Sequence, residues 1–184
     1  MDRPSGRFRV PHLDAFMIDV GLIGFGLAGR AFHAQVISRV PGLRLAAILQ
    51  RSGNEAAEQF PEARIVRSAE ELLSISEIRL VVIATPNDSH YFLAHKCLAA
   101  GRDVLVDKPF TTTVEEAVAL VEFAKQQGFQ VIVTNTRESN LAMIHLNLKM
   151  GFQIRGSAPH FYIEPDEAAI VMELRLQAGN PNTA

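Results

Sequence analysis

The sequence is poor in cysteine, in net charge and in long apolar runs. Its 184 residues include one cysteine, Cys97, so no disulfide can form within the chain, which fits a reducing cytoplasm. Its 18 lysines and arginines nearly balance 20 aspartates and glutamates, and no basic surplus indicates a nucleic-acid partner. No apolar run approaches about 18 residues, which argues against a membrane-spanning helix. The composition predicts a cytoplasmic globular protein without nucleic-acid or membrane partners.

The N-terminal region lacks the apolar core of a signal peptide. Residues 1–16 contain three arginines and two prolines, and we expect a flexible leader there. The chain length fits one substantial core, or one domain with an appendage, at about 100–200 residues per domain.

The most informative stretch is a glycine-rich turn between an apolar run at residues 18–23 and a helix-compatible segment at 30–39. In GxGxxG spacing, the first glycine makes a tight turn, the second lets the backbone approach a pyrophosphate, and the third lets the helix pack on its strand. The helix amides and dipole then face a phosphate. The alternative is a purely structural turn. The predicted cofactor-binding residues here are Gly24, Phe25, Gly26, Leu27, Ala28 and Gly29.

The end of the next predicted strand, residues 43–49, bears on the choice of dinucleotide. An acid at this place accepts a hydrogen bond from the ribose 2′-hydroxyl of NAD, whereas an arginine accommodates the 2′-phosphate of NADP. Arg51 and Ser52 follow the strand, and the first acid is Glu55. We therefore predict NADP, with NAD as the alternative, and Arg51 and Ser52 as cofactor-binding residues. The competing interpretation is that Arg51 is a solvated loop residue.

Residues 79–84 predict a fully buried strand of a parallel sheet, and a polar cluster follows its carboxyl end, where ligands bind in open α/β sheets. Thr85, Pro86, Asn87 and His90 are the predicted cofactor-binding residues of this cluster. His90 either acts as an acid or base or, as we expect, caps or lines the next helix. No third ligand accompanies His90 and His95, so no metal site is predicted.

Lys108 is the best single catalytic candidate. It follows a short strand at residues 103–106, so it lies at another carboxyl strand end together with Pro109. Near a nicotinamide ring, its ammonium would polarise or protonate the oxygen of a carbonyl that receives hydride. The alternative is a surface lysine before a structural proline. Cys97, on a predicted helix, is interpreted as a buried inert thiol.

The order of elements predicts an α/β fold, a Rossmann-type doubly wound parallel sheet whose sixth strand is residues 129–134. The tail predicts a helix at 140–150 and strands at 153–163 and 168–176. We expect 168–176 to pair antiparallel with 129–134, with 153–163 on the outer edge, in one mixed sheet.

These motifs, in order, resemble the nucleotide-binding domain of the Gfo/Idh/MocA oxidoreductases. The segments GFGLAGRAFHA, QRS, VVIATPNDSH, AGRDVLVDKPF and QVIVTN carry the resemblance. It implies NAD(P)-dependent redox chemistry on a sugar, polyol or similar carbonyl compound, a small-molecule substrate. It also implies that Thr85, Pro86 and Asn87 lie along the cofactor and that Lys108 and Pro109 belong to the (E/D)KP motif. The lysine of that motif lies beside nicotinamide and substrate, and Asp107 replaces the commoner glutamate here.

After Asn135 this resemblance stops, and residues 134–152 resemble a late segment of the GNAT N-acetyltransferases, with matching residues at Asn140, Met143 and Lys149. That superfamily's pyrophosphate loop is not found earlier in the chain. We expect a leader at 1–16, an NAD(P)-binding domain at 17–135, and a GNAT-like tail at 136–184 on the same sheet. Without the family's substrate domain, weak or no dehydrogenase activity is expected. An acetyl-CoA-dependent acyltransferase and a non-catalytic fusion or chimera are the alternatives, and a homo-oligomer is left open.

Overall fold

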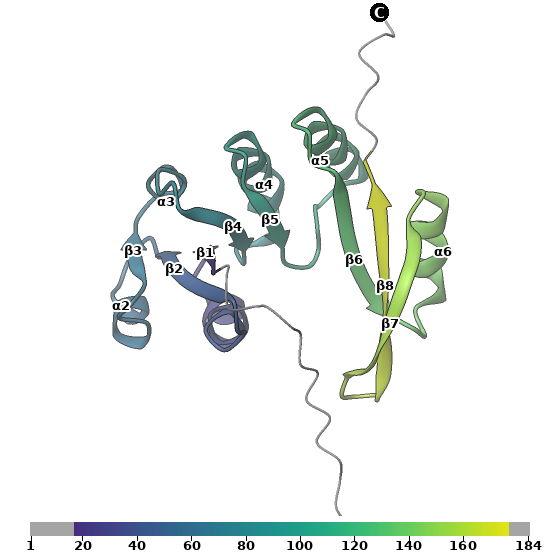
Figure 1. Ribbon diagram of the computed structural model, residues 1–184, viewed down its shortest axis with the longest axis horizontal. Coiled ribbons are helices and arrows are strands. Elements are labelled where there is room, and N and C mark those ends of the chain that lie inside the picture. The colour runs from purple at the N-terminus through teal and green to yellow at the C-terminus, as the bar shows by residue number, and fades with distance from the viewer. Residues whose placement is uncertain (1–16, 177–184) are drawn as a thin grey trace, which may run out of the picture. The chain divides into compact units, whose positions relative to one another are not determined.

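A parallel sheet organises the first part of the chain. The computed structural model describes residues 17–176. Strands β1 (Ile18–Ile23), β2 (Leu43–Leu49), β3 (Arg64–Val66), β4 (Ile78–Ile83) and β5 (Asp103–Val106) form one sheet in the order β3-β2-β1-β4-β5, all parallel (Figure 1). This order confirms the predicted Rossmann-type sheet and places β1 at its centre.

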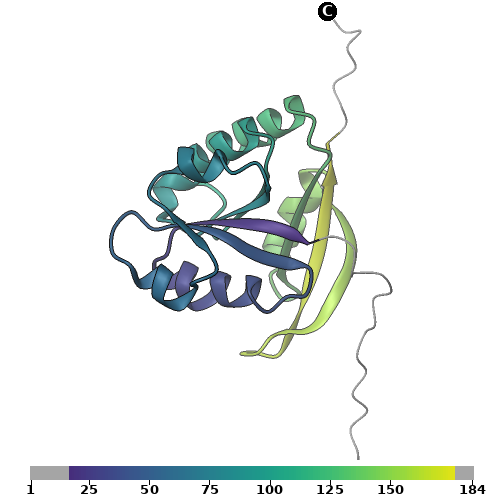
Figure 2. The ribbon, with the colours of Figure 1, turned by 60° about the vertical axis from the view of Figure 1, so that its left-hand side comes forward.

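Short helices cover both faces of this sheet. A π-helical turn η2 (Gly29–His33) with α1 (Ala34–Ile37), and α2 (Glu55–Gln59), lie on one face. Helices α3 (Ala69–Leu73) and α4 (His90–Ala99), the latter preceded by the 3₁₀ turn η3 (Asn87–Ser89), lie on the other face (Figure 2). This doubly wound arrangement follows from right-handed crossovers on either side of the central strand. It buries β1 on both faces: Leu22 and Ile23, whose side chains point to opposite faces of the sheet, are at most 1% exposed.

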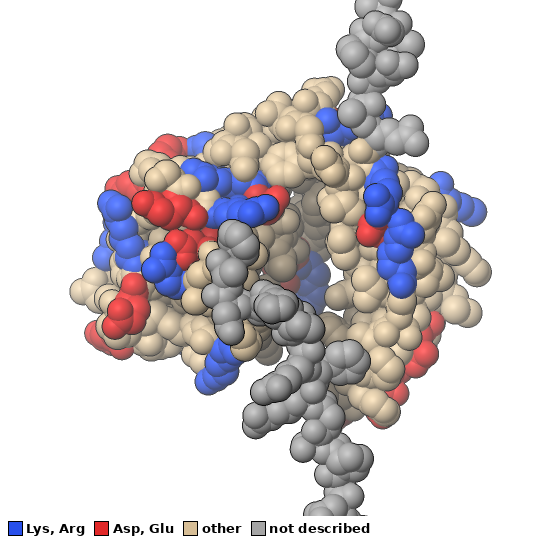
Figure 3. Space-filling model, in the orientation of Figure 1, with Lys and Arg blue, Asp and Glu red and all other residues tan. Residues whose placement is uncertain are grey.

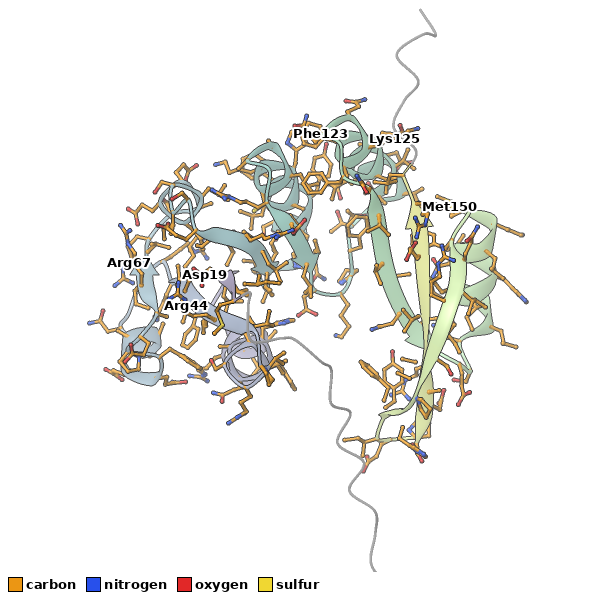
Figure 4. The ribbon with its side chains drawn as sticks, in the orientation of Figure 1. Asp19, Arg44, Arg67, Phe123, Lys125 and Met150 are labelled. Carbon is orange, nitrogen blue, oxygen red and sulfur yellow. The ribbon has the colours of Figure 1, made fainter. Side chains whose placement is uncertain are left out.

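A buried carboxylate at the amino ends of β1 and β2 is neutralised by its neighbour in the sheet. Asp19 is opposite Arg44 in the β1–β2 register, and the guanidinium donates from Nε and Nη2 to both carboxylate oxygens (Figure 4). This hydrogen bond raises the pKa of Arg44 above its usual value. The contact gives both oxygens of a buried acid a hydrogen-bond donor. It lies at the amino ends of the strands, whereas the candidate site lies at their carboxyl ends.

The second part of the chain forms its own sheet. The chain divides into two compact units, Met1–Leu120 and Val121–Ala184, and helix α5 (Val114–Gln126) contains the division. Strands β6 (Val131–Arg137), β7 (Gln153–Tyr162) and β8 (Glu167–Arg175) pair antiparallel in the order β6-β8-β7. Helix α6 (Leu141–Lys149) follows β6, and Asn140 caps it by accepting a hydrogen bond from the amide of Met143.

The predicted pairing of β8 with β6 and the outer position of β7 are confirmed, but the predicted single mixed sheet is wrong. Among the described strands, β6 pairs only with β8, so residues 129–134 do not supply a sixth parallel strand. The reason lies in the side chains of β6, which alternate between exposed and half-buried and end in Thr134, Asn135, Thr136 and Arg137. An inner parallel strand is covered on both faces and needs a continuous apolar run.

The surface carries charges of both signs. On the face in view in Figure 3, lysine and arginine side chains are intermixed with aspartates and glutamates, in keeping with the absence of a basic surplus. Between residues 17 and 176, no helix combines the length and the apolar character that a bilayer crossing requires.

The thiol of Cys97 is predicted to be unreactive in the folded protein. Cys97 is buried in α4, and burial raises the pKa of its thiol to about 12. We expect a thiol-reactive chromogenic disulfide at pH 8 to label the native protein slowly and the guanidinium-unfolded protein at one equivalent. Because folding raises the pKa of the Cys97 thiol, the neutral thiol contributes to the free energy of unfolding at pH values below about 8.5, the pKa in the unfolded chain. That contribution is lost as the pH rises toward 12. Rapid labelling of folded protein would contradict this.

Candidate functional site

The glycine turn lies at the carboxyl end of the central strand. Gly24 has φ +102°, and a Cβ atom there would lie 2.5 Å from the carbonyl oxygen of Ala84, at the end of β4. A Cβ atom at Gly29 would lie 2.0 Å from the carbonyl oxygen of Gly24. Hence the first glycine makes the turn and the third brings the helix onto the strand ends, as the spacing predicts.

The middle of the turn faces open space. A Cβ atom at Gly26 would meet no atom within 4 Å, and Leu27 is 75% exposed. Phe25 instead turns toward the core, where its ring meets Phe60 edge to face at a centroid distance of 6.0 Å. The side chains of the turn therefore leave its backbone accessible, which is the form needed to hold a pyrophosphate.

The helix that starts at this turn has no anionic cap of its own. No side chain caps it and no acid lies in its first turn, whereas Ser68 caps α3 and two glutamates follow it there. The first intrahelical bond runs from the amide of Arg30 to the carbonyl of Gly26, at 2.9 Å. The amides before Arg30 and the positive end of the helix dipole are therefore suited to an anion.

The end of β2 carries the residues predicted to choose the dinucleotide. Arg51 and Ser52 are exposed, and neither side chain is hydrogen-bonded to another described residue. Glu55 folds back toward the same loop, where its carboxylate accepts a hydrogen bond from the Gln50 amide. Hydrogen bonds from its own backbone amide and from Gln50 lower the pKa of Glu55. The loop thus presents one arginine, one hydroxyl and one carboxylate.

The turns after β4 and β5 are tied together by His90. Thr85 is half-buried, and Pro86 and Asn87 are exposed. His90 is wholly buried, with Nδ1 2.7 Å from the carbonyl oxygen of Pro109 and Nε2 2.9 Å from that of Thr85. Both ring nitrogens therefore lie against the backbone.

Lys108 is exposed at the end of β5, and its ammonium has no hydrogen bond or ion pair with a described residue. The carboxylate of Asp107 accepts from the amide of Lys108 at 2.8 Å, and its other oxygen lies 3.3 Å from Nε2 of His33 on the first helix. This contact joins the lysine turn to the helix that follows the glycine turn.

The structure thus brings the predicted residues of β1, β2, β4 and β5 to one edge of one sheet. Sequence reasoning missed His33, which lies in the quoted glycine-turn segment but was given no role, and Arg67, which belongs to no motif. His33 lies four residues after Gly29, a helical spacing that places both on one side of the helix and was a usable signal. Arg67 follows β3, and only the strand order shows that it adjoins the end of β2.

Comparisons with known proteins agree on the first two thirds of the chain. The family model described as an oxidoreductase family with an NAD-binding Rossmann fold, Gfo/Idh/MocA, matches residues 18–135. The uncharacterised oxidoreductase YdgJ of Escherichia coli strain K12 is 36% identical over 144 residues, 78% of this chain and 42% of YdgJ. The scyllo-inositol 2-dehydrogenase (NADP+) IolW of Bacillus subtilis strain 168 is 32% identical over 120 residues, 65% and 34% of the two chains.

A solved structure gives the same result. GenD2 from gentamicin A biosynthesis, crystallised in complex with NAD, matches with a TM-score of 0.60 at 32% identity, over 65% of this chain and 34% of GenD2. This chain spans less than half the length of these relatives. The 144 residues matched to YdgJ exceed the family match, so the oxidoreductase likeness continues beyond residue 135. The acetyltransferase resemblance of the tail gains no support from these comparisons.

The third and the middle glycine of the turn predict very different effects of an added methyl group on stability. In Gly29→Ala the Cβ would collide with backbone, so we expect a loss of about 3 kcal/mol in the free energy of unfolding. Gly26→Ala adds its methyl group to open space, so its free energy of unfolding is expected to lie within about 0.5 kcal/mol of the wild-type value. Urea unfolding followed by circular dichroism measures both. Equal stabilities of the two variants would contradict the geometry.

Proposed function

Because the chain belongs to the Gfo/Idh/MocA oxidoreductase family, we propose that it binds NADP(H) at the carboxyl edge of its parallel sheet. The pyrophosphate would lie against the turn of residues 24–29, on the amides that follow Gly24, since the Gly24 amide itself donates to the carbonyl of Leu49. The observation that supports this most is the open backbone around Gly26 at the start of a helix without an anionic cap. A nicotinamide dinucleotide bound there would supply the hydride for reduction of a carbonyl group or accept it in the reverse direction.

The proposed preference for NADP over NAD rests on the loop after β2. A 2′-phosphate carries negative charge and several strong acceptors, and Arg51 and Ser52 offer exposed donors without partners among the described residues. Glu55 is the group that would favour the 2′-hydroxyl of NAD instead. Its carboxylate already accepts hydrogen bonds from the Gln50 amide and from its own backbone, which makes it less available to a ribose 2′-hydroxyl.

Lys108 is the proposed catalytic residue. Its ammonium would donate to the carbonyl oxygen of the substrate and stabilise the negative charge that develops as hydride arrives at carbon. Asp107 and His90 would act through it: the first holds its amide, and the second holds the carbonyl of Pro109. With both nitrogens on backbone carbonyls, His90 is proposed to position the two turns, while Thr85, Pro86, Asn87 and Pro109 line the cofactor.

The proposed substrate class is a sugar, a polyol or a related carbonyl compound. IolW is named for its action on scyllo-inositol with NADP+, and that cyclic polyol is the natural first substrate to test. Because this chain spans 34% of IolW, turnover of any such compound by this chain is itself part of the proposal. The cytoplasmic location predicted from the composition remains a prediction, and a homo-oligomer remains an open alternative.

An acetyl-CoA-dependent acyltransferase is the second candidate. The observation that favours it is the β6-β8-β7 order with a capped helix α6, the arrangement expected from the acetyltransferase resemblance. The absence of that superfamily's pyrophosphate loop from the sequence weighs against it. A rise in melting temperature with acetyl-CoA and none with NADPH would reverse the ranking.

Titration of nicotinamide fluorescence tests the binding proposal. We expect NADPH to bind more tightly than NADH, and Arg51→Ala to weaken NADPH about tenfold with little change for NADH, as for the loss of one charge-assisted hydrogen bond. Arg39→Ala, in the turn before β2, is the matched control and should change neither. Absence of any signal at millimolar NADPH, with folded protein, would overturn the proposal.

The role of Lys108 predicts a separation of binding from chemistry. Where the wild-type chain turns over a carbonyl compound, which is itself part of the proposal, Lys108→Met is expected to lower the rate of NADPH oxidation at least about 100-fold, the usual contribution of a general acid. The dissociation constant of NADPH should change by less than about threefold. If Lys108 only bound the dinucleotide, its loss would instead raise that constant and leave the rate of hydride transfer unchanged. A variant that turns over at the wild-type rate would remove Lys108 from the mechanism.

A further inference from the structure

One arginine from the edge strand holds the loop after β2. Arg67, labelled in Figure 4, follows β3. Its Nη1 donates to the carbonyl oxygens of Gln50 at 2.7 Å and Gly53 at 2.9 Å. Its Nη2 donates to Oδ1 of Asn54 at 3.2 Å. A guanidinium presents its donors in a rigid planar fork, so these three acceptors are fixed relative to one another. A single side chain therefore closes the loop at both ends.

We infer that Arg67 is a positioning residue that sets the preference for NADP(H) over NAD(H), an inference that rests on the proposed function. The acceptors of Arg67 belong to Gln50, Gly53 and Asn54, on either side of Arg51 and Ser52. The clamp thus fixes the backbone of the two predicted phosphate ligands while leaving their side chains unengaged.

The charge of Arg67 contributes in the same direction. Two carboxylates lie at this loop: Glu55 accepts from Gln50, and Glu71 accepts from the backbone amide of Arg67 at 2.8 Å. Both would repel a 2′-phosphate, and neither would repel a 2′-hydroxyl. The guanidinium of Arg67 offsets part of that negative potential. Its loss therefore weakens a phosphate-bearing dinucleotide more than one that lacks the phosphate.

The full chain, titrated with NADPH and with NADH, tests the inference. Arg67→Met is expected to raise the dissociation constant of NADPH about tenfold and that of NADH less than about threefold, as for one lost charged contact. Arg64→Met is the matched control, because Arg64 begins the same strand and is exposed, without a hydrogen bond to another described residue. It should leave both constants within about twofold.

A double variant separates positioning from direct contact. If Arg67 acts by positioning Arg51, then adding Arg67→Met to Arg51→Ala changes the NADPH to NADH ratio far less than Arg67→Met does alone. Full additivity in the ratio would overturn the positioning role, as would equal weakening of both dinucleotides or no weakening of either.

The same set of variants also checks that the protein folds and that it binds a dinucleotide as proposed. If Arg67→Met does not fold by circular dichroism, Arg67→Lys replaces it. One ammonium cannot span the three acceptors, so the ratio should fall at least about threefold, and an unchanged ratio would overturn the inference. Wild-type protein that binds neither dinucleotide would instead refute the proposed function.

Discussion

The structure of the first unit depends on the close approach of one helix to the ends of two strands. The backbone of Gly29 lies against the carbonyl of Gly24, and Gly24 lies against Ala84 of the neighbouring strand. Neither contact leaves room for a Cβ atom. The interaction that packs the helix on the sheet therefore also places the helix amides over the centre of the sheet edge, so fold and candidate anion site share one constraint.

A second set of contacts holds the turns that surround this point. His90 is wholly buried, and its two ring nitrogens lie against the carbonyl oxygens of Thr85 and Pro109, so it joins the turns after β4 and β5. Asp107 reaches from the lysine turn to His33 on the first helix. These contacts connect the turns after β4 and β5 with each other and with the first helix, and they fix the backbone at the carboxyl ends of these strands.

Local patterns were sufficient to predict most of the first unit. The apolar runs gave β2 and β5 at their observed bounds, and Gly24, Gly29 and buried Cys97 have the roles expected of them. The assignment of residues 129–134 to the parallel sheet was wrong. The apolar first half of β6 hides an alternation of exposed and half-buried side chains that is typical of an antiparallel sheet. The antiparallel pairing of these residues with 168–176 was itself predicted, so the error was to give them a parallel neighbour as well.

The contacts of Arg67 with the loop after β2 could not be predicted from the sequence, for a different reason. It joins residues from 13 to 17 positions apart across two strands that are adjacent only in the folded sheet. No spacing rule connects a lone arginine at the end of one strand with a loop at the end of another. His33, by contrast, lay within the glycine stretch, and the periodicity of a helix was enough to place it beside Gly29.

The strand order separates two kinds of evolutionary change. The residues that would read the adenosine ribose follow β2 and β3 on one side of β1, and the lysine that would act on the substrate follows β5 on the other. Substitutions that alter preference for one redox pool of the cell need not disturb the reactive lysine, and the reverse also holds. A lineage built on this sheet can thus exchange its electron donor and its substrate in independent steps.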